Sequence, residues 1–131
     1  MQCPCNPENL YESCCQKAHN NINTVNTPEE LMRSRYSAFV LANMDYLQKS
    51  HHSTTRPNKR EKRKIEAWTK TVNWLKLEVL KTTMGKISDT AGTVEFKAFY
   101  MENGKMAVIH ENSNFTRENG HWVYVNGKHK A

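Results

Sequence analysis

Two Asn-Gly pairs, Asn103-Gly104 and Asn119-Gly120, constrain the fold of this chain most, because each separates segments in which apolar and polar residues alternate. Asn-Gly is the preferred pair for the two-residue turn of a β-hairpin, and alternation with a period of two is typical of strands. The alternation begins after Trp74. We therefore predict an antiparallel meander of four strands over 75–80, 94–101, 105–117 and 121–125.

The same turns predict the register of the sheet. Two-residue loops place Glu102 opposite Lys105 and Glu118 opposite His121, which sets Phe96 opposite Glu111. Cross-strand partners share a face, so one face should be strongly aromatic with Glu111 as its only carboxylate, unless a bulge in the third strand shifts it. The residues predicted on this face are Val94, Phe96, Ala98, Tyr100, Ala107, Ile109, Glu111, Ser113, Phe115, Trp122 and Tyr124.

Three helices should precede the sheet, over about 28–42, 45–52 and 58–72. Thr27-Pro28-Glu29-Glu30 offers an N-cap, a proline at the first helical position and a capping-box glutamate. The apolar side of the first helix should collect Leu31, Met32, Tyr36, Ala38, Phe39 and Ala42. Arg35 falls on this apolar side, whereas Arg33 points away from it and should be solvated.

Arg35 and Glu111 are the only charged residues on the two apolar surfaces, and an unpaired charge is expensive to bury. We therefore predict that they meet as an ion pair. The pair could be a bridge that fixes helix against sheet. Alternatively, it could form the polar end of a ligand cavity whose aromatic walls are Tyr36, Phe96, Trp122 and Tyr124.

All four cysteines, Cys3, Cys5, Cys14 and Cys15, lie within the first fifteen residues. A disulfide between adjacent Cys14 and Cys15 would be strained, and four inert thiols would have little apolar cover. Four sulfurs so close in sequence favour one tetrahedral metal ion, with Zn²⁺ the preferred metal and His19 a spare ligand.

The 131 residues suffice for one compact domain with a short appendage, which we divide into a zinc knuckle over 1–22 and an α+β domain over 23–131. The apolar runs are too short to cross a membrane. The first eight residues have no signal-peptide pattern, and reduced cysteines are typical of the cytosol, so we expect a cytoplasmic protein. The formal charge is +6, with a basic cluster at Lys59, Arg60, Lys62, Arg63 and Lys64. This cluster is either a solvated helix face or a contact for RNA or another polyanion.

The cysteine spacing resembles the SEC-C motif, and that resemblance assigns the ligand role to the four cysteines, although Asn6-Pro7-Glu8 replaces the usual glycine-rich turn. Further segments resemble the bacterial YchJ-like proteins: 31–40 followed by Asp45-Tyr46-Leu47, 74–80, 94–96, 110–115, 120–124 and Gly127. The resemblance implies a nuclear-transport-factor-2-like cone, in which helices pack on a curved four-stranded antiparallel sheet.

Three functions fit these features. A zinc-knuckle adaptor would contact a protein or ribosomal partner. A binding protein would hold a small ligand in the cone. An enzyme would need a base such as His51 beside Asp45, because His110 and Glu111 are adjacent on a strand and point to opposite faces. The outer face of the sheet could also support a homodimer through Phe99, Met101, Val108, Val123 and Val125.

Overall fold

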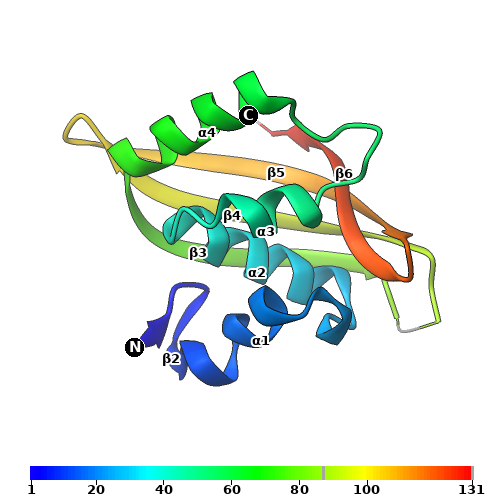
Figure 1. The fold of residues 1–131 in the computed structure, drawn as a ribbon. Coiled ribbons are helices and arrows are strands. Elements are labelled where there is room, and N and C mark those ends of the chain that lie inside the picture. Colours follow the sequence, from blue (N-terminus) through cyan, green and yellow to red (C-terminus); the bar gives the residue numbers. More distant parts are fainter. Residues whose placement is uncertain (87, 131) are drawn as a thin grey trace.

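The four long strands form one curved antiparallel sheet in the order β3-β4-β5-β6 (Figure 1). The computed structural model describes residues 1–86 and 88–130. Its sheet consists of β3 (Asn73–Met84), β4 (Ala91–Glu102), β5 (Lys105–Glu118) and β6 (His121–His129). The predicted α+β class and four-stranded meander are confirmed, with longer strands than the alternation alone indicated.

Both predicted Asn-Gly turns are present, and both residues of each turn have positive φ, as a type I′ turn requires. Phe96 pairs with Glu111 and Phe115 with Tyr124, as predicted. The one irregularity between β5 and β6 leaves Val125 without a partner, because Asn114 pairs with Asn126 and Phe115 with Tyr124. The bulge therefore lies in β6 and not in β5, and the predicted face is preserved.

The three predicted helices are α2 (Pro28–Val40), α3 (Met44–Lys49) and α4 (Lys59–Thr71). The Thr27 side chain caps α2 by accepting from the Glu30 N–H. The helix ends two residues earlier than predicted because Ala42 adopts a positive φ of 54°. The N–H groups of Ala42 and Asn43 bond back to Phe39 and Ala38, which is the Schellman arrangement.

The helices α2 and α3 lie in front of the sheet in Figure 1, and α4 lies above them. Leu31 and Ala38 on α2 are fully buried, as are Val94 and Trp122 on the sheet. Val123 is fully buried too, so this residue cannot contribute to an outer dimer face as the sequence had suggested. Val108 on the same face is exposed.

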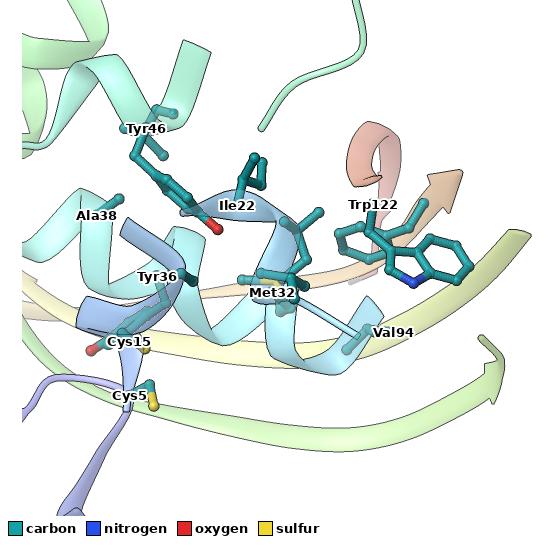
Figure 2. Close-up of a cluster of buried hydrophobic side chains, with 14 of the residues drawn as sticks. Cys5, Cys15, Ile22, Met32, Tyr36, Ala38, Tyr46, Val94 and Trp122 are labelled. Atoms are coloured by element: carbon teal, nitrogen blue, oxygen red, sulfur yellow. The ribbon is translucent and has the colours of Figure 1, made fainter. Parts of the chain in front are cut away.

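The N-terminal segment packs against α2 and extends the core. It consists of a small hairpin, β1 (Gln2–Cys3) and β2 (Asn6–Leu10), a turn η1 (Tyr11–Ser13), helix α1 (Cys15–Asn20) and a turn η2 (Ile22–Thr24). Cys3, Cys5 and Cys15 belong to the same cluster of buried side chains as Trp122. Figure 2 shows Cys5 and Cys15 at one end of this cluster and Trp122 at the other. Among the described residues, no helix is long and apolar enough to cross a membrane.

Candidate functional site

The four cysteine sulfurs converge beside α2. Cys3 and Cys5 come from the small hairpin, Cys14 precedes α1 and Cys15 is the first residue of that helix. All four sulfurs lie within 4.8 Å of one another, and the Cys3–Cys5 and Cys5–Cys14 separations are 3.6 Å. A tetrahedral ion with metal–sulfur bonds of about 2.3 Å needs sulfur–sulfur separations of about 3.8 Å. The donor set therefore fits one metal ion of this kind.

Electrostatics within the cluster also favour a cation. A hydrogen bond from the Cys15 thiol lowers the pKa of Cys5 to about 6, against the opposing effect of burial. Burial raises the pKa of Cys14 to about 11. The pKa of Cys15 is raised as well, chiefly because its thiol hydrogen-bonds to Cys5. One thiolate is thus stabilised by its neighbours, whereas ionising all four requires a positive charge among them.

Helix α2 supplies polar contacts around the cluster. The Ser37 hydroxyl lies 3.7 Å from the Cys3 sulfur. The Arg33 guanidinium donates to the Cys5 carbonyl at 3.3 Å and pairs with Glu29 at 2.9 Å. The expectation that Arg33 is simply solvated was wrong, because the knuckle folds back onto the side of α2 that faces away from the sheet. Arg33 therefore ties the cysteine-bearing segment to the cone.

His19 is not placed as a spare ligand. Its Nε2 lies 2.8 Å from the Ser34 carbonyl, so this nitrogen carries the proton, and its Nδ1 accepts from the Tyr11 hydroxyl at 2.6 Å. The ring also packs against Tyr46, with centroids 4.6 Å apart. Both nitrogens are thus engaged, and His19 joins α1 to α2.

A cavity of about 260 Å³ lies between the concave face of the sheet and the helices. Of the residues predicted to line it, the structure brings together Arg35, Tyr36, Phe96, Glu111 and Tyr124. Trp122 does not line the cavity. Its side chain is fully buried at the other end of the core, where Nε1 donates to the Asn26 carbonyl. It shares the predicted face of the sheet, but η2 and the start of α2 cover that end.

Arg35 and Glu111 do not form the predicted direct ion pair. Arg35 Nη1 donates to the Leu47 carbonyl at 2.9 Å and to the Ser50 hydroxyl at 2.7 Å. Its guanidinium lies 4.8 Å from the centre of the Tyr124 ring, and the Tyr124 hydroxyl donates to Glu111 at 3.2 Å. Tyr124 therefore stands between the two charges and contacts both.

Glu111 is held tightly at the same end of the cavity. Its Oε2 accepts from the Ser113 hydroxyl at 2.5 Å, and its Oε1 lies 3.5 Å from His129 Nε2. A Cβ on Gly127 would lie 2.0 Å from Glu111 Oε2, so a side chain there would displace the carboxylate. A glycine inside a strand often marks such a close approach, and this signal could have revealed the contact.

The other end of the cavity is aromatic and was not foreseen in full. Trp68 on α4 and Trp74 on β3 meet edge to face with ring centroids 5.5 Å apart. Trp68 donates to Glu102 and Trp74 to Thr69, so each indole nitrogen has a partner. Phe39 of α2 completes this end. The sequence predicted only a helix around Trp68, because no local pattern shows that α4 lies across the cone.

The candidate bases lie apart. His51 lines the cavity, and its Nε2 is 3.1 Å from the Thr55 hydroxyl, whereas Asp45 is almost fully exposed and faces Lys62. The suggested His51–Asp45 pair is therefore absent from the described residues. His110 pairs with Glu95 at 2.7 Å on the opposite face from Glu111.

The basic cluster lies on the early turns of α4. Lys59, Arg60, Arg63 and Lys64 are exposed, and Lys62 is partly buried. The helix begins with a complete capping box between Asn58 and Glu61, which places a carboxylate at its positive end.

Two solved structures share this combination of knuckle and cone. The solution structure of a SEC-C motif protein from Rhodopseudomonas palustris superposes with a TM-score of 0.86 at 29% identity. The superposition covers 100% of both chains. The crystal structure of a SEC-C motif protein from Psychrobacter arcticus gives a TM-score of 0.80 at 30% identity, covering all of this chain and 84% of that one. Fold and cysteine cluster together define the class of SEC-C motif proteins with an α+β cone.

Relatives in sequence identify the family. Residues 27–127 match the family described as YchJ, middle NTF2-like domain. A UPF0225 protein of Vibrio parahaemolyticus is 44% identical over 125 residues, which cover 95% of this chain and 73% of that protein. A UPF0225 protein of Shewanella sp. MR-4 is 38% identical over an alignment that covers 95% of this chain and 79% of that protein. This chain therefore belongs to the YchJ-like, or UPF0225, family, as its sequence resemblance indicated.

Proposed function

We propose that this protein binds a small organic molecule in the cavity of its cone, and that Zn²⁺ held by the four cysteines fixes the N-terminal knuckle on the cone. The cavity carries the first part of the proposal. A core that served stability alone would be filled, because a void forfeits packing energy. Here about 260 Å³ remains open beside aromatic rings and a buried arginine.

The choice of zinc is supported by the donor set. Sites made only of thiolates in a tetrahedral arrangement favour zinc or iron–sulfur, and a single ion suits the spacing of the sulfurs. Cys3, Cys5, Cys14 and Cys15 would complete the coordination, which leaves no open position for a reacting water. The metal would therefore be structural. Reduced cysteines of this kind also support a cytosolic location.

Ligand binding can be tested by NMR on the zinc-loaded full chain. A set of small aromatic molecules with negative, neutral and positive substituents would be added while the three tryptophan indole N–H signals are followed. Trp68 and Trp74 line the cavity and Trp122 does not, so the third signal is an internal control. We expect binders to move the first two signals and leave the third in place.

A cavity-filling variant sharpens this test. Ala98 lies on the floor of the cavity and is 3% exposed, so Ala98→Leu would place three more carbon atoms in the open space. We expect this variant to keep its thermal stability and to lose binding. The proposal fails if no molecule of the set moves the Trp68 and Trp74 signals, or if binding survives in Ala98→Leu.

The adaptor role is a second candidate, supported by the outer surface of the knuckle. Leu10 and Met1 are both 60% exposed, and the Tyr11 N–H bonds to the Met1 carbonyl, which holds the two residues in one region. Affinity capture with wild type and Leu10→Ser would test this role without touching the metal ligands. Equal recovery of partners by both proteins would argue against it. Contact with a polyanion through the basic cluster on α4 remains a further proposal.

A further inference from the structure

The polar end of the cavity has an excess of hydrogen-bond donors. Arg35 is 7% exposed, and its Nη1 donates to the Leu47 carbonyl and the Ser50 hydroxyl. In the described part of the chain, Arg35 Nε and Nη2 make no hydrogen bond. No fully buried side-chain nitrogen in that part of the chain lacks a partner. These two nitrogens therefore reach open space, and the open space that Arg35 lines is the cavity.

The nearest carboxylate does not use those donors. Glu111 Oε2 accepts from Ser113 and Tyr124, and its Oε1 lies nearest to His129. The Tyr124 ring stands against the guanidinium, and its hydroxyl contacts the carboxylate. Burial lowers the pKa of Arg35 to about 10, so the side chain remains charged at neutral pH. A buried cation thus keeps two parallel donors for a group that the protein does not supply.

The geometry of the donors indicates what that group is. The Nε and Nη2 edge of a guanidinium matches the two oxygens of a carboxylate, and such bidentate contacts are stronger than hydrogen bonds between neutral groups. The opposite end of the cavity is formed by Trp68, Trp74 and Phe39, whose ring faces and edges suit a flat apolar body.

The length and volume of the cavity limit the ligand. Trp74 pairs with Tyr100, and Phe96 pairs with Glu111, so the two ends are four residues apart along β4. This corresponds to about 13 Å at a rise of about 3.3 Å per residue. The volume of about 260 Å³ falls just below the range of roughly 300–1,000 Å³ for drug-sized sites. One or two rings with a short acidic chain would fill it.

We propose, on the basis of the ligand-binding function above, that the natural ligand is a small aromatic carboxylic acid. Its carboxylate sits on Arg35 Nε and Nη2, and its ring lies between Trp68, Trp74 and Phe39. Arg35 is held for this contact by Leu47 and Ser50. Tyr124 keeps Glu111 turned toward Ser113, so the carboxylate of the protein does not compete for the guanidinium.

Three probes of similar size test the charge of the ligand on the zinc-loaded wild-type chain. Cinnamate, cinnamamide and cinnamylamine share one ring and one short chain but carry a negative, a neutral and a positive end. The dissociation constants would be read from the Trp68 and Trp74 indole signals, with Trp122 as control. We expect cinnamate to bind at least tenfold more tightly than either of the other two. A smaller preference, or no shift with cinnamate at 10 mM, would overturn the inference.

A conservative variant tests the role of Arg35. Arg35→Lys keeps a positive charge but loses the two parallel donors, so we expect a loss of about tenfold in cinnamate affinity and no change for cinnamamide. Equal losses for both probes would contradict the bidentate contact. Because the three probes are compared on wild type, the inference stays testable if the variant folds poorly. Tight binding of cinnamamide alone would refute the acid while leaving the ligand-binding function intact.

Discussion

Gly127 provides a quantitative test of the polar end of the cavity. A Cβ at this position would lie 2.0 Å from Glu111 Oε2, 2.3 Å from its Cδ and 2.7 Å from its Cγ. Because the contact extends to Cγ, rotating the carboxylate cannot relieve it, and the whole side chain must move. Gly127→Ala should therefore break the bonds that Glu111 accepts from Ser113 and Tyr124.

The cost follows from those two bonds. A hydrogen bond to a charged group contributes about 1.5–3 kcal/mol, and partial relaxation recovers some of the loss, so we expect Gly127→Ala to lower the free energy of unfolding by about 2–4 kcal/mol. The measurement is equilibrium unfolding in urea with zinc present. In a Glu111→Ala background the obstruction is gone, so the same change should cost less than about 0.5 kcal/mol, which gives a coupling energy of roughly 1.5 kcal/mol or more.

A second glycine supplies the control. Gly104 has a positive φ of 77°, and a Cβ added there would meet nothing within 4 Å, so Gly104→Ala is costly for its backbone conformation alone. Its cost should be the same in wild type and in Glu111→Ala. The proposed obstruction is refuted if Gly127→Ala costs the same in both backgrounds, because its effect would then have nothing to do with the Glu111 side chain.

Three further predictions concern the metal, the pH dependence and the basic cluster. Purified protein should contain one zinc per chain by elemental analysis, and Cys5→Ser should lose it together with about 2 kcal/mol or more of stability; a variant that keeps stoichiometric zinc would argue against the four-cysteine site. Burial, followed by the charges of Arg35 and Arg56, lowers the pKa of His51 to about 4. As pH falls from about 6.5 to about 4, His51 becomes protonated in the unfolded chain but stays neutral in the folded chain. The free energy of unfolding should therefore fall by on the order of 1–2 kcal/mol after solvent screening. In His51→Asn, the pH dependence measured by urea unfolding should be flatter. The double variant Arg60→Gln, Arg63→Gln should leave stability unchanged within about 0.5 kcal/mol and weaken heparin or RNA binding with a shallower salt dependence; unchanged polyanion affinity would remove the proposed contact.

Local sequence rules predicted most of the fold because the decisive interactions are short in sequence. The Asn-Gly turns set the register of β4 with β5, and Thr27 with Glu30 set the start of α2. The end of α2 escaped prediction because Ala42 is not a residue that ordinarily favours positive φ. The positive φ of Ala42 is stabilised by the Schellman hydrogen bonds and by the turn into α3, and no single residue type predicts it.

The candidate site was only partly predictable, because many of its contacts join residues that are far apart in the sequence. Face sharing on the sheet correctly placed Phe96 and Glu111 together, but it also assigned Trp122 to the cavity. The same sheet face is long enough to line the cavity at one end and the filled core around Trp122 at the other. Only the packing of the helices separates these two regions. The predicted ion pair between Arg35 and Glu111 does not form because the Tyr124 side chain packs between them. Opposite charges on facing surfaces indicate attraction, but they do not show which side chain will fill the space between them.

The sequence by itself determined the α+β class, the meander and its register, the helix starts, the four clustered thiols and the family. These depend on backbone geometry, on capping and on contacts between neighbours in the chain. Only the tertiary structure decided that Tyr124 lies between Arg35 and Glu111, that Arg33 joins the knuckle to the cone, and that α4 brings Trp68 to the cavity. Such contacts join residues far apart in the chain, and their geometry depends on how rigid elements pack together.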